Sequence, residues 1–239
     1  ANAFATGDIV INGVPIGPSQ DSFDTASSAN QSSSAIAKAE AINRVSDQTG
    51  VTAKVNSNII NGGAITPGTG QTGNVDINGV TINISYSGSD TATDIQNTVV
   101  SAINNKAGQT GVRAEAFGDK FRLIADDGRN IEVSNINTIN NSGLTTASAR
   151  SSLTLLSAGK IELSSITGEI QQSGFDIGAS GSSENGQLIQ DIDISTVQGA
   201  TLALAAVDNA LTTINSQRAN LGAIQNRFES TISNQAITA

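Results

Sequence analysis

The sequence predicts an α+β protein: two small repeat-related units of β-hairpin, helix and β-strands, followed by a long amphipathic α-helix of coiled-coil type. Three patterns in the 239 residues predict this architecture. Alternating apolar residues interrupted by Asn-Gly indicate β-hairpins. Apolar residues four positions apart indicate helices that pack through one face. Near the C-terminal end, apolar residues alternate at intervals of three and four, which is typical of a helix lying along another helix.

The N-terminal part of the chain contains two copies of one unit. Residues 11–16, Ile-Asn-Gly-Val-Pro-Ile, return as residues 77–82, Ile-Asn-Gly-Val-Thr-Ile. Residues 41–53 and 102–114 both contain Ala-Ile-Asn followed by Gln-Thr-Gly-Val. A repeat of this kind indicates two copies of one supersecondary unit. We therefore predict one repeat at residues 1–60 and a second at 61–150.

Copy two has the clearer pattern of elements. The Asn78-Gly79 pair lies between two alternating runs and predicts a hairpin. A helix should begin after Ser89-Asp90-Thr91 and be closed by Gly108. Its apolar stripe consists of Ile95, Val99, Ile103 and Ala107. Strands are then expected over residues 112–116, 121–125 and 131–133.

The turn at Asp126-Asp127-Gly128 has two interpretations. Its two carboxylates could belong to a Ca²⁺ loop, but the alternating series of Asx residues and the distal Glu of such loops are absent. Asp-Gly also supplies the backbone angles of a turn between strands. We therefore expect a turn and no metal site.

Copy one predicts a helix near Ser33–Ser46 and a strand at Val51–Val55, but it lacks a clear final hairpin. Residues 135–151 read as polar and irregular. Residues 151–186 predict a strand pair around Gly159 and a Gly/Ser-rich connection that starts at Gln171. The C-terminal core helix segment is expected at residues 187–239.

The C-terminal helix predicts a continuous apolar seam from Ser195 to Asn234. A capping box, Ser195 with Gln198, should begin it. Its length would be roughly 60 Å. One seam position holds Val197, Leu204, Leu211, Arg218, Gln225 and Ile232, and the other holds Ala200, Val207, Ile214, Leu221 and Phe228. The rest of the chain offers no seam of comparable length, so the sequence predicts a partner helix from outside it.

Composition excludes most catalytic chemistry. The chain has no Cys and no His, which removes thiol nucleophiles, Cys or His metal sites and Ser-His-Asp triads. A formal charge of −9 argues against nucleic acid or an anionic membrane as a partner. The chain contains no apolar run of about 18 residues, and no signal peptide opens it. We expect no enzyme activity, no cofactor and no metal.

Residues 206–211 and 216–232 resemble the C-terminal core helix of bacterial flagellin, and the Ile-Asn-Gly repeats resemble the hook IN motif of flagellin variable domains. The resemblance implies a structural subunit of the flagellar filament, secreted and extracellular, which supports motility. Its implied partners are other flagellin subunits, the N-terminal helices of flagellin and an innate immune receptor. This chain is expected to be a fragment that lacks those N-terminal helices.

The resemblance assigns assembly or receptor contact to one helical segment. Its residues are Val207, Leu211, Ile214, Arg218, Leu221, Gln225, Arg227 and Phe228. Arg218 has a second interpretation, as a polar residue that sets the helix register. Two other functions remain open: a flagellar cap or hook-associated protein, and an extracellular glycan- or protein-binding adhesin module.

Overall fold

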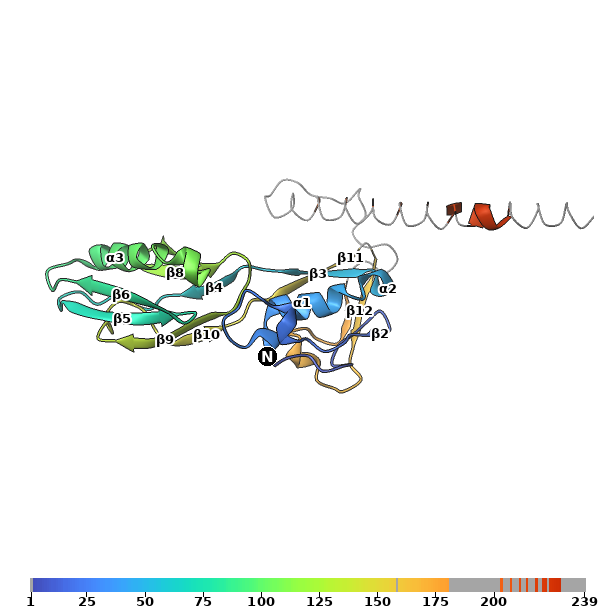
Figure 1. Ribbon diagram of the computed structural model, residues 1–239, viewed down its shortest axis with the longest axis horizontal. Helices are drawn as coiled ribbons and strands as arrows, with labels where there is room; N and C mark the ends of the chain where they lie inside the picture. The colour runs from blue at the N-terminus through green and yellow to red at the C-terminus, as the bar shows by residue number, and fades with distance from the viewer. Residues whose placement is uncertain are drawn as a thin grey trace, which may run out of the picture. The chain divides into compact units, whose positions relative to one another are not determined.

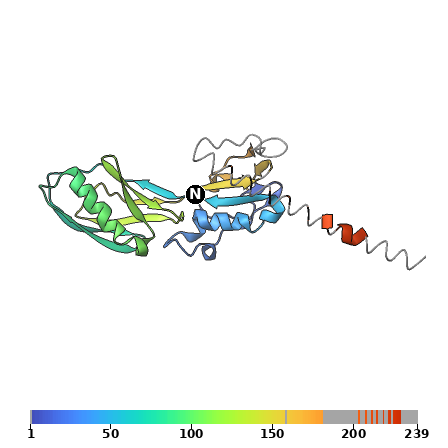
Figure 2. The ribbon, with the colours of Figure 1, turned by 90° about the horizontal axis from the view of Figure 1, so that it is seen from above.

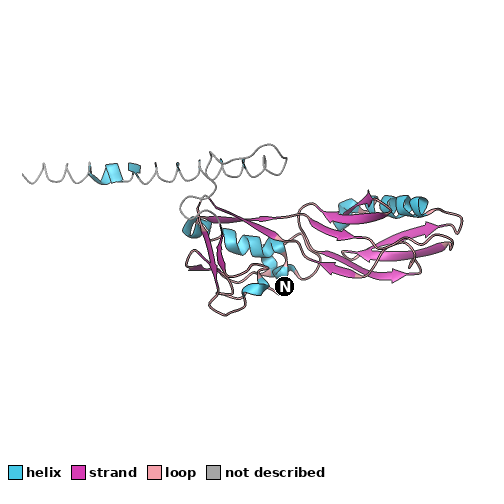
Figure 3. Ribbon diagram, turned by 180° about the vertical axis from the view of Figure 1, so that it is seen from behind, coloured by secondary structure: helices cyan, strands magenta, loops and turns pink. Residues whose placement is uncertain are grey.

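The computed structural model describes residues 2–157 and 159–180 and a set of helical residues further along the chain, namely Ala203, Val207, Leu211, Ile214, Arg218, Leu221, Gly222 and 224–228. The chain divides into two compact units, Ala1–Leu155 with Glu162–Gly178, and Leu156–Ile161 with Ala179–Ala239. Helices and strands both contribute to the described part (Figures 1 and 3), so the predicted α+β class is confirmed.

Copy two consists of two antiparallel sheets and a helix packed on both of them. One sheet has the strand order β10-β9-β5-β6, and the other has the order β4-β8-β7. Helix α3 (Ala92–Asn104) contacts β6 and β7, as the green helix of Figure 2 shows. The strands are β4 (Asn58–Asn61), β5 (Gln71–Ile77), β6 (Val80–Tyr86), β7 (Arg113–Phe117), β8 (Lys120–Ala125), β9 (Ile131–Asn137) and β10 (Ala147–Ala149).

The predicted hairpin and helix of copy two are confirmed. In the hairpin, Asn78 and Gly79 have φ angles of 49° and 78°, the left-handed pair that a two-residue turn between twisted strands requires. The side chain of Thr91 caps α3 and forms a capping box with Asp94. Three residues of the predicted stripe, Ile95, Val99 and Ile103, are fully buried between the sheets. Burial of each such side chain stabilises the fold by about 1.5–3 kcal/mol.

Copy one begins with the short hairpin of β1 (Val10–Ile11) and β2 (Val14–Pro15). The 3₁₀ turns η1 (Asp21–Phe23) and η2 (Gln31–Ser33) lead into α1 (Ala35–Asn43). The short helix α2 (Ser46–Thr49) and strand β3 (Val51–Val55) follow. The predicted helix and strand of copy one are therefore confirmed.

Copy one does not lack its final strands; they come after copy two in the sequence. Strand β11 (Leu153–Ser157) pairs with β3, and β12 (Ile161–Ser164) pairs antiparallel with β1. In copy two, β8 pairs with β7 and β9 pairs with β5 in the same way. The two strands predicted around Gly159 are thus present, but each is bonded to an N-terminal strand. Copy two occupies the connection between β3 and β11.

The two copies share their hydrogen bonds as well as their strand order. The amide of Asn78 donates to the Thr110 carbonyl at 2.9 Å, and its side-chain oxygen accepts from the backbone N–H of Glu132 at 2.8 Å. Its backbone N–H donates to the Glu132 carbonyl at 2.9 Å. Copy one has the same three bonds, at 2.8, 2.8 and 2.9 Å, among Asn12, Thr49 and Glu162. The Asn of each Ile-Asn-Gly motif therefore ties a hairpin turn to the end of a helix and to a third strand.

The prediction that Gly108 closes the helix of copy two was wrong. Helix α3 ends at Asn104, and the next residue, Asn105, remains in the right-handed helical region. A second short helix, α4 (Ala107–Thr110), includes Gly108, and Gly111 with φ of 69° ends it. Copy one ends α2 at Gly50 in the same way. The Gln-Thr-Gly triplet of the repeat is therefore the helix stop.

Two segments predicted as irregular contain regular structure. In residues 135–151, β9 continues to Asn137, β10 pairs with β9, and Ile139 and Leu144 are buried in the core of copy two. The predicted Gly/Ser-rich connection overlaps the 3₁₀ turn η3 (Ile170–Gln172) and contains strand β13 (Gly178–Ser180), which pairs with β12. Isolated apolar residues in polar sequence give no periodicity, so only the tertiary contacts reveal these elements.

Candidate assembly helix

The predicted seam lies on a helix wherever the structure describes it. Val207, Leu211 and Ile214 are helical, and so are Arg218, Leu221, Gln225 and Phe228. At 1.5 Å per residue, Val207 and Phe228 are separated by roughly 32 Å along the axis. The capping box at Ser195 and the seam residues 197, 200, 204 and 232 lie outside the described residues. The described seam thus consists of successive a and d positions of three heptads.

The seam side chains are exposed. Leu211 is 53% exposed, Leu221 60% and Phe228 65%, and Val207 and Ile214 are exposed as well. Large apolar side chains of this kind are usually buried, so a row of them along one helix face indicates a contact surface. This surface is suited to packing against another helix, because its apolar side chains can insert between those of a facing helix, as in a coiled coil.

Two residues change the surface that the sequence predicted. Ile224 precedes the seam residue Gln225, is 46% exposed and widens the apolar face, although it was not among the predicted site residues. A count of flanking g positions in the heptad would have found it. Arg227 falls at a c position, on the outward side of the helix, so it is not part of the packed stripe. Arg218 is exposed and interrupts the apolar row.

The turn at residues 126–128 uses its carboxylates in ion pairs. The guanidinium of Arg113 contacts Asp126 at 2.7 Å, and that of Arg129 contacts Asp127 at 2.6 Å. The hydrogen bond from Arg113 lowers the pKa of Asp126. Gly128 has φ of 76°, as a turn requires. The residues described here contain no group of three His, Cys, Asp or Glu side chains that could hold a metal.

The part of the chain that the structure describes contains no helix with the length and apolar character needed to cross a bilayer.

The C-terminal region is similar to known proteins. Residues 204–239 match the family model described as the bacterial flagellin C-terminal helical region. The resemblance to bacterial flagellin is confirmed. Among curated relatives, B-type flagellin of Pseudomonas aeruginosa is 59% identical over 46 residues, which cover 19% of this chain and 9% of that protein. The flagellin match includes every described seam residue from Val207 to Phe228.

Two further relatives are also similar over a short part of the chain. Polar flagellin A of Vibrio parahaemolyticus is 44% identical over 70 residues, covering 29% of this chain and 19% of that protein. The flagellar filament 30.7 kDa core protein of Treponema maltophilum is 48% identical over 44 residues, covering 18% and 15%. The chain therefore aligns with less than a fifth of the length of each of these flagellins.

Proposed function

We propose that this chain is part of a structural subunit of the bacterial flagellar filament, extracellular and without catalytic activity. The observation that carries the proposal is the exposed apolar seam, which lies within the residues that match flagellin. In the proposed subunit, the seam packs in a coiled coil against the N-terminal helical region of a flagellin. Other flagellin subunits then assemble through this helix pair.

The proposed subunit keeps the predicted division of the chain. Residues 1–60 and 61–150 contribute the variable region, and residues 187–239 contribute the core helix. Residues 151–186 connect the two and supply β11 and β12, which complete copy one. Contact between the seam helix and an innate immune receptor stays a prediction.

Assembly on filament seeds tests the proposal. The N-terminal helical region of the Pseudomonas aeruginosa B-type flagellin would be joined to residue 1, and elongation of flagellin seeds would be followed by electron microscopy. We expect elongation by this extended chain. The substitution Leu221→Asp should abolish it, because a carboxylate would be buried at a d position of the helix pair.

Asn226→Asp is the matched control. It adds the same charge to the same helix at an exposed b position, outside the seam, and should leave elongation unchanged. If both substitutions block elongation equally, the added charge explains the effect, and the proposal that the seam packs against a second helix is wrong. If the extended chain fails to elongate seeds that accept their own flagellin, the filament proposal is wrong.

A further inference from the structure

The buried faces of the two helices differ at several positions, and two of those in copy one, Ala35 and Lys38, border a cavity. Residues of α1 and α3 correspond at an offset of 61, as Ala41-Ile42-Asn43 and Ala102-Ile103-Asn104 show. On this alignment, the fully buried Val99 of α3 corresponds to Lys38 of α1. The buried Gln96 corresponds to Ala35. Copy one therefore carries a cation and a small residue where copy two carries an apolar and a long polar residue.

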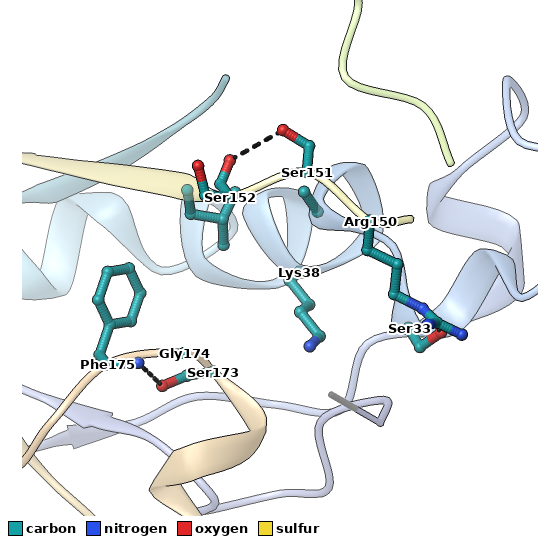
Figure 4. A pocket seen from close by; sticks show the side chains of 10 residues that line it. Ser33, Lys38, Arg150, Ser151, Ser152, Ser173, Gly174 and Phe175 are labelled. Atoms are coloured by element: carbon teal, nitrogen blue, oxygen red, sulfur yellow. Dashed lines mark hydrogen bonds between the residues drawn. The ribbon is translucent and has the colours of Figure 1, made fainter. Parts of the chain in front are cut away.

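Copy one has a cavity beside Ala35, at the place where copy two has the longer side chain of Gln96. In copy two, the amide of Gln96 donates to the backbone carbonyls of Gly118, at 3.0 Å, and of Lys120, and so fills the space beside the β7–β8 turn. In copy one, no such turn joins β3 to β11, because the residues of copy two lie between these two strands in the sequence. A cavity of about 350 Å³ lies at this place, lined by Ala35, Lys38, Arg150, Ser151, Ser152 and Phe175 among others (Figure 4).

Two cations face this cavity. Lys38 is only 4% exposed, and its Nζ donates to the carbonyl of Gln172 at 2.6 Å and lies 5.1 Å from the centre of the Phe4 ring. Burial, reinforced by the charge of Arg150, lowers the pKa of Lys38 to about 8. The Nε of Arg150 donates to the hydroxyl of Ser33 at 2.9 Å. Figure 4 shows the Lys38 side chain between α1 and the segment 173–175.

The lining supplies no negative charge to balance these cations. It contains no Asp or Glu, and its polar groups include the hydroxyls of four serines, Ser33, Ser151, Ser152 and Ser173. Apolar walls come from Ala35, Leu153 and Phe175. A buried cation without a carboxylate partner is costly, and an anion held between two cations removes that cost. The volume is in the range of small-molecule sites.

We propose that this cavity binds a small organic anion through Lys38 and Arg150. The guanidinium of Arg150 and the hydroxyl of Ser152 offer hydrogen bonds to a carboxylate or phosphate group, and Lys38 supplies a point charge beneath it. The hydroxyls of Ser33, Ser151 and Ser173 already donate to backbone carbonyls. The Phe175 wall takes the carbon part of the ligand. None of the residues that line the site belongs to the seam helix.

Titration of the whole 239-residue chain with three probes tests this site. Inorganic phosphate, glycerol 3-phosphate and gluconate would be added separately, and binding followed by NMR shifts of backbone amides near the cavity and by calorimetry. We expect saturable binding of at least one probe, and the three arms distinguish a phosphate ligand from a carboxylate ligand. Absence of saturable binding by all three overturns the proposal.

Three variants and one control locate the binding. Lys38→Met and Arg150→Gln each remove one cation and should weaken binding about tenfold, the loss of one charge-assisted hydrogen bond. Ala35→Gln keeps both cations but fills the cavity with the side chain found in copy two, and should abolish binding. Lys54→Gln removes an exposed cation of β3 and should change nothing. Binding that survives Ala35→Gln, or that falls equally in the control, overturns the proposal.

Discussion

Copies one and two share the hydrogen bonds of two asparagines but differ in chain order. In both, the Asn of Ile-Asn-Gly joins the hairpin, the helix end and a third strand. In both, an Asn at the end of the helix, Asn43 or Asn104, bonds the backbone of the next strand. Copy two is continuous from β5 to β9, whereas copy one is interrupted between β3 and β11. The hydrogen bonds from these asparagine side chains to the backbone are therefore common to both copies of the unit. The turn between two of its strands can be replaced by a whole second unit.

The cores of the two copies differ as well. Helix α3 presents Ile95, Val99 and Ile103 to copy two, all fully buried. Helix α1 presents mainly alanines and Lys38. Helix α1 therefore contributes smaller apolar side chains to its core than helix α3 does.

The largest effect is expected from a deletion of copy two, which tests whether copy one is an independent folding unit. Residues 57–151 would be replaced by Gly-Asp, the two residues that join β7 to β8, so that β3 continues directly into β11. The deletion keeps the strands of copy one and the bonds of Asn12, and it removes the bonds that Asn130 and Arg150 make to residues 27–33. Because the strand pairing of copy one is retained, we expect it to fold alone. Far-UV circular dichroism should show a cooperative thermal transition. A chain without such a transition would mean that copy one depends on copy two for folding.

A core truncation in each copy gives the next effect. Phe121→Ala in β8 removes a side chain that is 1% exposed and should lower the free energy of unfolding by about 4 kcal/mol. The corresponding residue of β11, Leu153, is only half-buried, and Leu153→Ala should cost about half as much. Denaturant unfolding followed by the fluorescence of Tyr86, in copy two, and by circular dichroism measures both. Equal losses of unfolding free energy in the two variants would contradict the difference in burial between Phe121 and Leu153.

Loss of the motif Asn should have a smaller effect, and an unequal one. Asn78→Ala leaves the Glu132 N–H and the Thr110 carbonyl without their partner in a buried turn, at a cost of about 2–3 kcal/mol. Asn12→Ala removes the same bonds at an exposed position and should cost about 1 kcal/mol, because water replaces them. Urea unfolding of both variants checks the order. A larger cost at Asn12 would mean that copy one relies on this bond more than its exposure indicates.

The last prediction concerns a pH dependence that Lys38 should give to copy one. The folded-state pKa of Lys38, about 8, lies below the ordinary value of 10.5. Between these values the unfolded chain binds more protons than the folded one, so stability rises as the pH increases through that window. Thermal melts from pH 8 to 9.5 in buffers free of phosphate and carboxylates measure this rise.

Lys38→Met is the control for that measurement, because it removes the titrating group. Its melting temperature should change less with pH over the same range than that of the unchanged chain. A rise of the same size in both proteins would assign the effect to another group.

The sequence by itself predicted the repeat, the helix of each copy, the N-terminal cap of α3, the hairpin of copy two and the position of the flagellin-like helix. These features are local: an Asn-Gly turn, a capping box and an apolar stripe depend on residues a few positions apart. The seam residues were also found from spacing alone. Their exposure comes from the structure, for those that it describes.

Only the tertiary structure decided which strands complete copy one. Strand β12 reaches β1 across some 150 residues, and Glu162 resembles Glu132 only once their bonds to Asn12 and Asn78 are known. The cavity at Lys38 also required the structure, because a lysine within an alanine-rich helix reads as a solvated residue. Pairing over such separations is set by packing and backbone hydrogen bonds, which leave no periodic signal in the sequence.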